Sequence, residues 1–135
     1  MKEFEVYSGY RQFYVADIDL NPGAPEEWTE QNILERHLPE ENLAAFVPEN
    51  DISAHIFAFG PGEVISDFGP ADFQVTTTIL VPSRKVGVLG WPWELKDSYT
   101  LNEKTCHIRF SGYKTDLVGE NQDFYTLEVS EEEFT

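Results

Sequence analysis

The stretch from Asp17 to Gly23, DIDLNPG, contains the residue types that come closest to a chemical site. Oxygen-bearing side chains alternate along it and a glycine follows, as at the start of a calcium-binding loop. An EF-hand loop that began at Asp17 would need glycine at its sixth position and glutamate at its twelfth, where Pro22 and Trp28 stand. Proline cannot make the sharp turn and tryptophan cannot ligate an ion. The spacing therefore excludes an EF-hand, and we predict no metal site.

The pair Asp17 and Asp19 has a second chemical interpretation. Two strand residues on one face lie about 6.6 to 7 Å apart, a separation that suits the paired carboxylates of glycoside hydrolysis. Both aspartates stand where a strand would run out into the Pro22-Gly23 turn, and nothing nearby indicates a carboxyl group that stays protonated. We interpret them as the polar end of a strand.

The other reactive residue types are isolated in the sequence. His37, His55 and His107 form neither a His-x-His pair nor a His-Glu-x-x-His motif, and no serine stands in a Gly-x-Ser-x-Gly elbow. Cys106 is the only cysteine, and we predict it to be a small buried strand residue rather than a reactive thiol. We therefore predict no catalytic residue and no cofactor, and we do not expect an enzyme.

Charge is the strongest compositional signal. The 135 residues include 25 acidic and 9 basic ones, a formal net charge of −16. Nucleic acid and anionic membranes both require a basic surface, so neither is an expected partner. Thirteen of the acids lie between Gln12 and Ser83, where Arg36 is the only basic residue. This span predicts either an electronegative binding face or a merely solubilising surface. The candidate binding residues in it are Asp17, Asp19, Glu26, Glu27, Glu30 and Glu35.

Alternation of apolar and polar residues predicts that short strands make up most of the chain. The run Phe73–Val81 alternates until Pro82 ends it, and Ala54–Phe59 is apolar on both faces, as expected of a central strand. Near the amino terminus the pattern predicts either one bent strand or two strands separated by Ser8-Gly9, over Phe4–Tyr7 and Tyr10–Asp19. Further strands are predicted at Arg84–Leu89 as the return arm of a hairpin, at Ser98–Leu101 as an edge strand, at Cys106–Phe110 and at Tyr125–Val129.

One segment, Pro25–Leu38, predicts a helix. It has a proline at its start, acids in its first turn and Pro39 as a stop. Four residues would form its buried apolar stripe, Trp28, Ile33, Leu34 and Leu38. The glutamates of the segment would then face water.

Seven or eight strands with one early helix predict a mainly β protein, an antiparallel β-sandwich that forms a single domain over residues 1–130. We expect the acidic tail, residues 131–135, to fray. No apolar run approaches the roughly 18 residues that span a bilayer, and the amino terminus lacks the apolar centre of a secretion signal. We therefore expect a cytoplasmic protein.

Trp91-Pro92-Trp93 is the other conspicuous stretch, because two tryptophans that flank a proline cannot both belong to a regular central strand. We predict that one of them covers the core. The alternative is an exposed aromatic contact, to a partner protein or to a sugar ring. Trp91 and Trp93 are therefore added to the candidate binding residues.

The order of these elements resembles a known family. The matching segments are the stretch Tyr-Arg-Gln-Phe-Tyr-Val, the helix Glu-Trp-Thr-Glu-Gln-Asn-Ile, the apolar His-Ile-Phe-Ala-Phe strand, the long Phe73–Val81 strand and the two carboxyl-terminal strands. In this order they resemble the competence protein J family of DNA-entry nuclease inhibitors. The likeness extends over nearly the whole chain. The resemblance implies that the protein binds and inhibits a nuclease.

A physical argument leads independently to the same partner. A nuclease binds a polyanion in a basic cleft, which a small acidic domain can occupy in place of phosphates. We predict an acidic protein-binding domain, an inhibitor or immunity-type partner of a nuclease or another basic protein. The alternative is a sandwich that binds a small molecule or carbohydrate through its aromatic loops.

Overall fold

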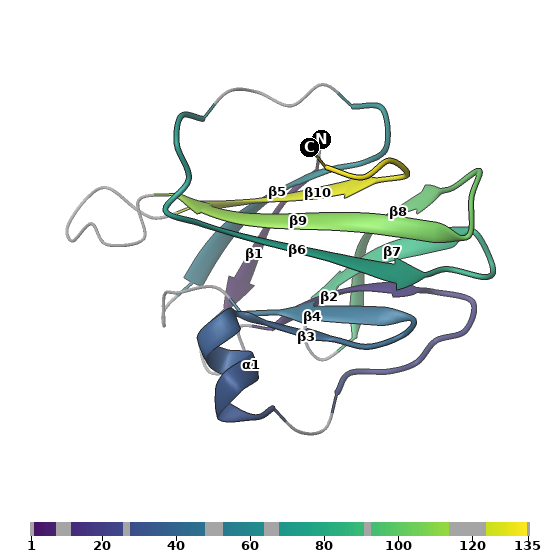
Figure 1. Cartoon of the computed structure of the whole chain (residues 1–135), viewed down its shortest axis with the longest axis horizontal. Coiled ribbons are helices and arrows are strands. Elements are labelled where there is room, and N and C mark those ends of the chain that lie inside the picture. The colour runs from purple at the N-terminus through teal and green to yellow at the C-terminus, as the bar shows by residue number, and fades with distance from the viewer. Residues whose placement is uncertain are drawn as a thin grey trace.

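The fold is built from two five-stranded sheets stacked face to face (Figure 1). The computed structural model describes residues 2–7, 12–25, 28–47, 53–63, 68–90, 93–113 and 124–134. The mainly β class is confirmed, and these residues form ten strands rather than seven or eight. No helix in this described part is long and apolar enough to cross a membrane.

The strands of each sheet come from distant parts of the chain. Sheet A has the order β1 (Lys2–Tyr7), β5 (Ser53–Phe59), β10 (Phe124–Ser130), β9 (Thr105–Tyr113) and β6 (Phe73–Leu80). Sheet B has the order β3 (His37–Pro39), β4 (Leu43–Phe46), β2 (Phe13–Asp17), β7 (Lys85–Gly90) and β8 (Glu94–Thr100). Every pairing in the two sheets is antiparallel except β5 with β10, which is parallel.

The main core lies between the sheets, and aromatic rings join its two halves. Phe13 of sheet B lies 5.4 Å from Phe46 of the same sheet and 5.1 Å from Phe110 of sheet A, measured between ring centroids. Phe110 in turn stacks on Tyr125 at 5.5 Å. All four rings are fully buried. Such ring pairs add to the free energy of burial, so this cluster is a large part of what holds the layers together.

A second apolar cluster covers the outer face of sheet B. Its buried members include Tyr14 of β2, Leu43 of β4 and Leu89 of β7, and the partly buried Trp28 and Trp93 pack against them. Strands β2 and β4 are therefore buried on both faces, which is why neither shows alternating burial. The chain after β2 crosses this outer face and provides much of its cover.

The structure confirms the positions or the burial patterns predicted for several strands. In β6, exposed and inward-facing residues alternate as the sequence predicts. The apolar strand β5 lies between β1 and β10, and β8 is an edge strand. The predicted hairpin between β6 and β7 is wrong. β6 pairs with β9 in sheet A and β7 pairs with β2 and β8 in sheet B, so the turn between them crosses from one layer to the other.

The predicted helix over Pro25–Leu38 is wrong in both of its bounds. The helix α1 covers only Glu30–Glu35. Thr29 is its N-cap, and a reciprocal capping box with Asn32 starts the helix at this residue. Arg36 then takes a left-handed conformation with φ of 64°, which ends the helix and starts β3. The predicted apolar stripe is wrong as well, because no residue of α1 is buried.

Candidate functional site

The predicted site residue Asp17 lies at the buried end of β2. Its carboxylate accepts four hydrogen bonds, from the Asp19 and Leu20 backbone N–H groups at 3.0 and 3.1 Å and from the Ser83 hydroxyl and N–H at 2.6 and 3.0 Å. Burial, the largest influence, raises the pKa of Asp17, but the hydrogen bonds outweigh it and lower the pKa below its usual value. This buried carboxylate joins the turn after β2 to the turn at Ser83, so it is not available to a partner protein.

Asp19 lies two residues further on and is exposed. Its Oδ2 atom lies 3.9 Å from Nζ of Lys85, and both side chains are more than half exposed. Ion pairs of this kind contribute little to stability because water and salt screen them. Glu26, Glu27 and Trp91, which the sequence also put forward, lie outside the described residues.

Helix α1 exposes large apolar side chains, which a helix that only supports the core would bury. Ile33 and Leu34 are 54% and 76% exposed, and the exposed carboxylates of Glu30 and Glu35 belong to the same short helix. Gln31 donates a hydrogen bond of 2.7 Å to Glu35. In Figure 1, α1 stands apart from both sheets beside one end of β3. The helix thus offers an apolar centre with acidic neighbours, although it adds nothing to the core.

The turn at the other end of β3 carries a second pair of acids. Glu40 and Glu41 follow the three residues of β3 and are both exposed. A strand of three residues spans about 10 Å, so α1 and these acids lie at the two ends of one short strand, along the same sheet edge. We call this surface the α1–β3 edge. It consists of Glu30, Ile33, Leu34, Glu35, Glu40 and Glu41.

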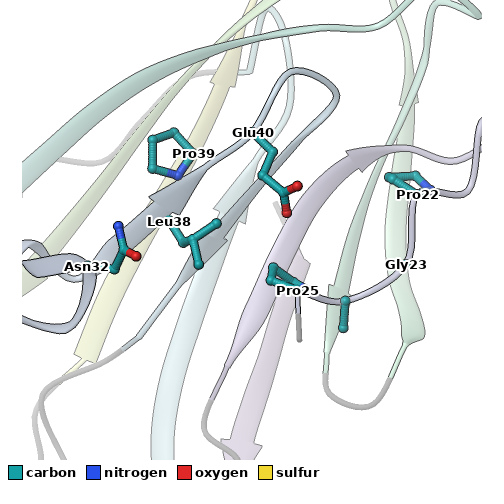
Figure 2. A pocket seen from close by; sticks show the side chains of 8 residues that line it. Pro22, Gly23, Pro25, Asn32, Leu38, Pro39 and Glu40 are labelled. Carbon is teal, nitrogen blue, oxygen red and sulfur yellow. The ribbon is translucent and has the colours of Figure 1, made fainter. Parts of the chain in front are cut away.

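A shallow hollow of about 620 Å³ lies beside the α1–β3 edge. The segment Pro22–Pro25 forms one wall, and Asn32, Leu38, Pro39 and Glu40 form the other. Figure 2 shows the Glu40 side chain reaching over this hollow, between Leu38 on one side and Pro22 and Pro25 on the other. Prolines have no N–H donor, so three of the eight lining residues offer only carbonyl acceptors. The hollow therefore suits a basic side chain better than an anionic one.

Trp93 lies against the second apolar cluster and not at an aromatic contact surface. Its ring centroid lies 5.3 Å from that of Tyr14, and its Nε1–H donates a hydrogen bond of 2.7 Å to Oδ1 of Asn21. The side chain is therefore committed to packing and to holding the loop after β2. Among the described residues, no group of three or more metal-binding side chains comes together.

Sequence reasoning found part of the α1–β3 edge and missed the rest. Glu30 and Glu35 were candidates and are exposed. Ile33 and Leu34 were expected inside the protein, because helical spacing of apolar residues normally marks a buried face. The sequence signal that could have corrected this expectation is the pair Thr29 and Asn32. Their spacing fits a capping box, which starts the helix after Thr29 and leaves it only six residues.

Comparisons with known proteins bear on this geometry. A scan against protein-family models finds no match, and a search of curated proteins finds none. Among solved structures, "ComJ, inhibitor of the DNA degrading activity of NucA, from Bacillus subtilis" matches with a TM-score of 0.71 over 96% of this chain and 95% of that chain. The two chains share the ComJ fold.

The sequence identity with ComJ is 16%, so the likeness concerns the fold and does not by itself assign an activity. It confirms the resemblance to the competence protein J family at that level. A second structure, "Crocagin biosynthetic gene J", matches with a TM-score of 0.45 and 9% identity over 94% of this chain and 95% of that chain.

Proposed function

We propose that this protein is an inhibitor that binds a nuclease through the α1–β3 edge. The observation that carries the proposal is the composition of α1, where Ile33 and Leu34 stand exposed next to Glu30 and Glu35. An exposed apolar patch with a polar rim is typical of a protein–protein contact, and Ile33 and Leu34 are adjacent in the chain between the two glutamates. Acidic neighbours restrict the partner to a surface that is basic around an apolar spot.

The chemistry of a nuclease meets this description. Its cleft must attract a polyanion, so it presents lysine and arginine side chains around the site where DNA enters. The glutamates of the α1–β3 edge would speed association and set orientation, and Leu34 and Ile33 would provide affinity at the dry centre of the contact. Glu40, whose side chain reaches over the hollow, would receive one of the basic side chains. The ComJ fold adds support, since that protein is described as an inhibitor of a nuclease.

The inhibitor would act by exclusion. A rigid β-sandwich that occupies the basic cleft blocks DNA without contacting catalytic atoms, so inhibition needs no chemical step in this chain. Because charge drives the encounter, the association rate should fall as salt rises, while the apolar contact should mainly set the dissociation rate.

The test uses the full chain in a DNA-degradation assay with NucA of Bacillus subtilis and with basic nucleases recovered from the source cell on immobilised protein. Replacing Glu30 and Glu35 together by glutamine should weaken inhibition by about tenfold and flatten its salt dependence. Leu34→Ser should weaken it by a similar factor through faster dissociation.

A matched control keeps the change of net charge and moves its position. Glu132 and Glu133 are exposed residues of the carboxyl-terminal segment, distant in sequence from α1. Their double glutamine variant should inhibit within about twofold of the wild type. Equal losses in the two double variants would show that net charge alone matters, and no loss in either would reject the α1–β3 edge as the contact.

A further inference from the structure

The four outer strands of the two sheets differ in how well they prevent another strand from pairing. β1 carries three charged residues among its six, KEFEVY, and β8 carries three among its seven, ELKDSYT. β3 has only three residues and ends in proline. Charges, prolines and short length are the usual protections of a sheet edge. β6 is eight residues long, FQVTTTIL, and has none of them.

The backbone of β6 shows which of its groups face outward. Val81, just after the strand, donates its N–H to the Lys104 carbonyl on the β9 side. Leu80 faces the other way, donating its N–H to the Glu41 carbonyl and accepting from Nδ2 of Asn42. Because successive residues alternate, Gln74, Thr76 and Thr78 also direct their N–H and C=O groups away from β9. Within the described residues no partner is found for these groups.

Both ends of this free stretch contact the sheet edge that carries α1 and β3. At one end, the Arg36 guanidinium lies 4.3 Å above the Phe73 ring. At the other end, the Leu80 N–H is bound by the carbonyl of Glu41, whose side chain belongs to the α1–β3 edge. The open stretch of β6 is therefore continuous with the acidic surface.

We infer that β6 binds an extended, basic segment of the partner protein by adding it as a sixth strand to sheet A. This inference rests on the proposed function and specifies how the partner is held. Main-chain hydrogen bonds to Gln74, Thr76 and Thr78 would give the affinity of the added strand. Lysine or arginine side chains on that strand would lie next to the glutamates of the α1–β3 edge, which gives the contact its charge preference.

Charge argues against a second copy of this chain as the occupant. Pairing β6 with β6 would bring two α1–β3 edges together, and like charges brought together at an interface oppose association. A chain with a net charge of −16 gains instead from a basic segment.

A peptide titration tests the inference without needing the nuclease. The probe is a capped nonapeptide, KTVTKTVTK, added to the full chain labelled with nitrogen-15. Hydrogen exchange at the Gln74, Thr76 and Thr78 amides should slow at least about tenfold at saturation, because these N–H groups gain acceptors. The amides of Val75 and Thr77, already bound to β9, should change little.

Two control peptides separate the backbone from the charge. A version with every internal amide N-methylated should give no protection, and one with glutamate in place of lysine should bind at least about tenfold more weakly. On the protein side, Thr76→Pro removes the outward N–H from an edge position and should abolish binding, while Thr76→Ala keeps it and should bind as the wild type.

Protection confined to other segments, or an equal effect of the methylated peptide, overturns the inference, and so does equal binding by Thr76→Pro and Thr76→Ala. If Thr76→Pro fails to fold, the exchange data decide alone. A dimer in sedimentation, with slow β6 amides in the free chain, would identify a second copy as the occupant and also overturn it. Nuclease inhibition without peptide binding rejects only the strand addition, and peptide binding without inhibition rejects only the inhibitor proposal.

Discussion

Removing the Asp17 carboxylate should be among the most damaging single changes to the fold. Asp17→Ala leaves four donors without their acceptor, two at the turn after β2 and two on Ser83. Hydrogen bonds to a charged group contribute about 1.5–3 kcal/mol each, but the turn amides can regain water, so the free energy of unfolding should fall by about 3–5 kcal/mol in total. For a chain of this size that lowers the melting temperature by roughly 10–18 °C.

The pH dependence of the effect has a definite sign. Hydrogen bonding holds the pKa of Asp17 below that of the unfolded chain, which is about 3.9. The stabilisation is therefore fully present above the unfolded pKa and disappears as the pH falls through the folded pKa. The difference in stability between the wild type and Asp17→Asn should stay constant from about pH 8 to pH 5 and shrink below about pH 4.

Urea unfolding followed by circular dichroism at several pH values measures both quantities. Ser83→Ala provides the partner variant for a double-mutant cycle, and the two changes should cost less together than the sum of their separate costs. A loss below about 1 kcal/mol for Asp17→Ala, or a difference that persists unchanged at about pH 2.5, would refute the role given to this carboxylate.

Three further predictions concern the two apolar clusters. Burial raises the pKa of the Cys106 thiol to about 12, so iodoacetamide at about pH 8 should modify it only as the protein unfolds, and rapid labelling of the native protein would contradict its burial. Gly112→Val should cost about 2–3 kcal/mol in urea unfolding, because a Cβ there would lie 2.3 Å from the Phe73 ring; an unchanged midpoint would show that the ring moves aside freely. Trp93→Phe should cost about 1 kcal/mol by losing the bond to Asn21, and Asn21→Gly, which keeps the left-handed backbone of Asn21 at φ 50°, should add little to that loss if the bond is the cause.

The strands that could be predicted from the sequence are those with one face in water or a long apolar run. β6 alternates because its outer face is exposed. Most of β5 is apolar because Ile56 and Ala58 are buried and Phe57 packs against the rings of Phe68 and Phe124. β4, with the sequence LAAF, gave no signal. It is short, lacks β-branched residues and is buried on both faces, so neither alternation nor strand propensity marks it.

Contacts between residues distant in the chain determine those features of the fold and of the site that the sequence did not reveal. Asp17 and Asp19 are indistinguishable in the sequence, and Asp17 becomes structural only because Ser83, 66 residues away, reaches it. The distance between β6 and β7 along the chain suited a hairpin equally well, and nothing local indicated that the turn crosses between layers. The spacing of Trp28 and Leu38 suggested a helical stripe. Both side chains instead pack against the second apolar cluster from segments that are not helical.

The position of β10 has a consequence for how the fold forms. This strand is the last in chain order, yet it lies between β5 and β9 in the interior of sheet A. Until it arrives, β5 and β9 each have an unpaired side, and a large part of the main core is open to water. During synthesis on a ribosome, sheet A therefore cannot close before residues 124–130 have left the exit tunnel. Folding of sheet A should therefore be slow, since its deciding pairs are distant in sequence, and a chain that lacks β10 exposes the open edges of β5 and β9.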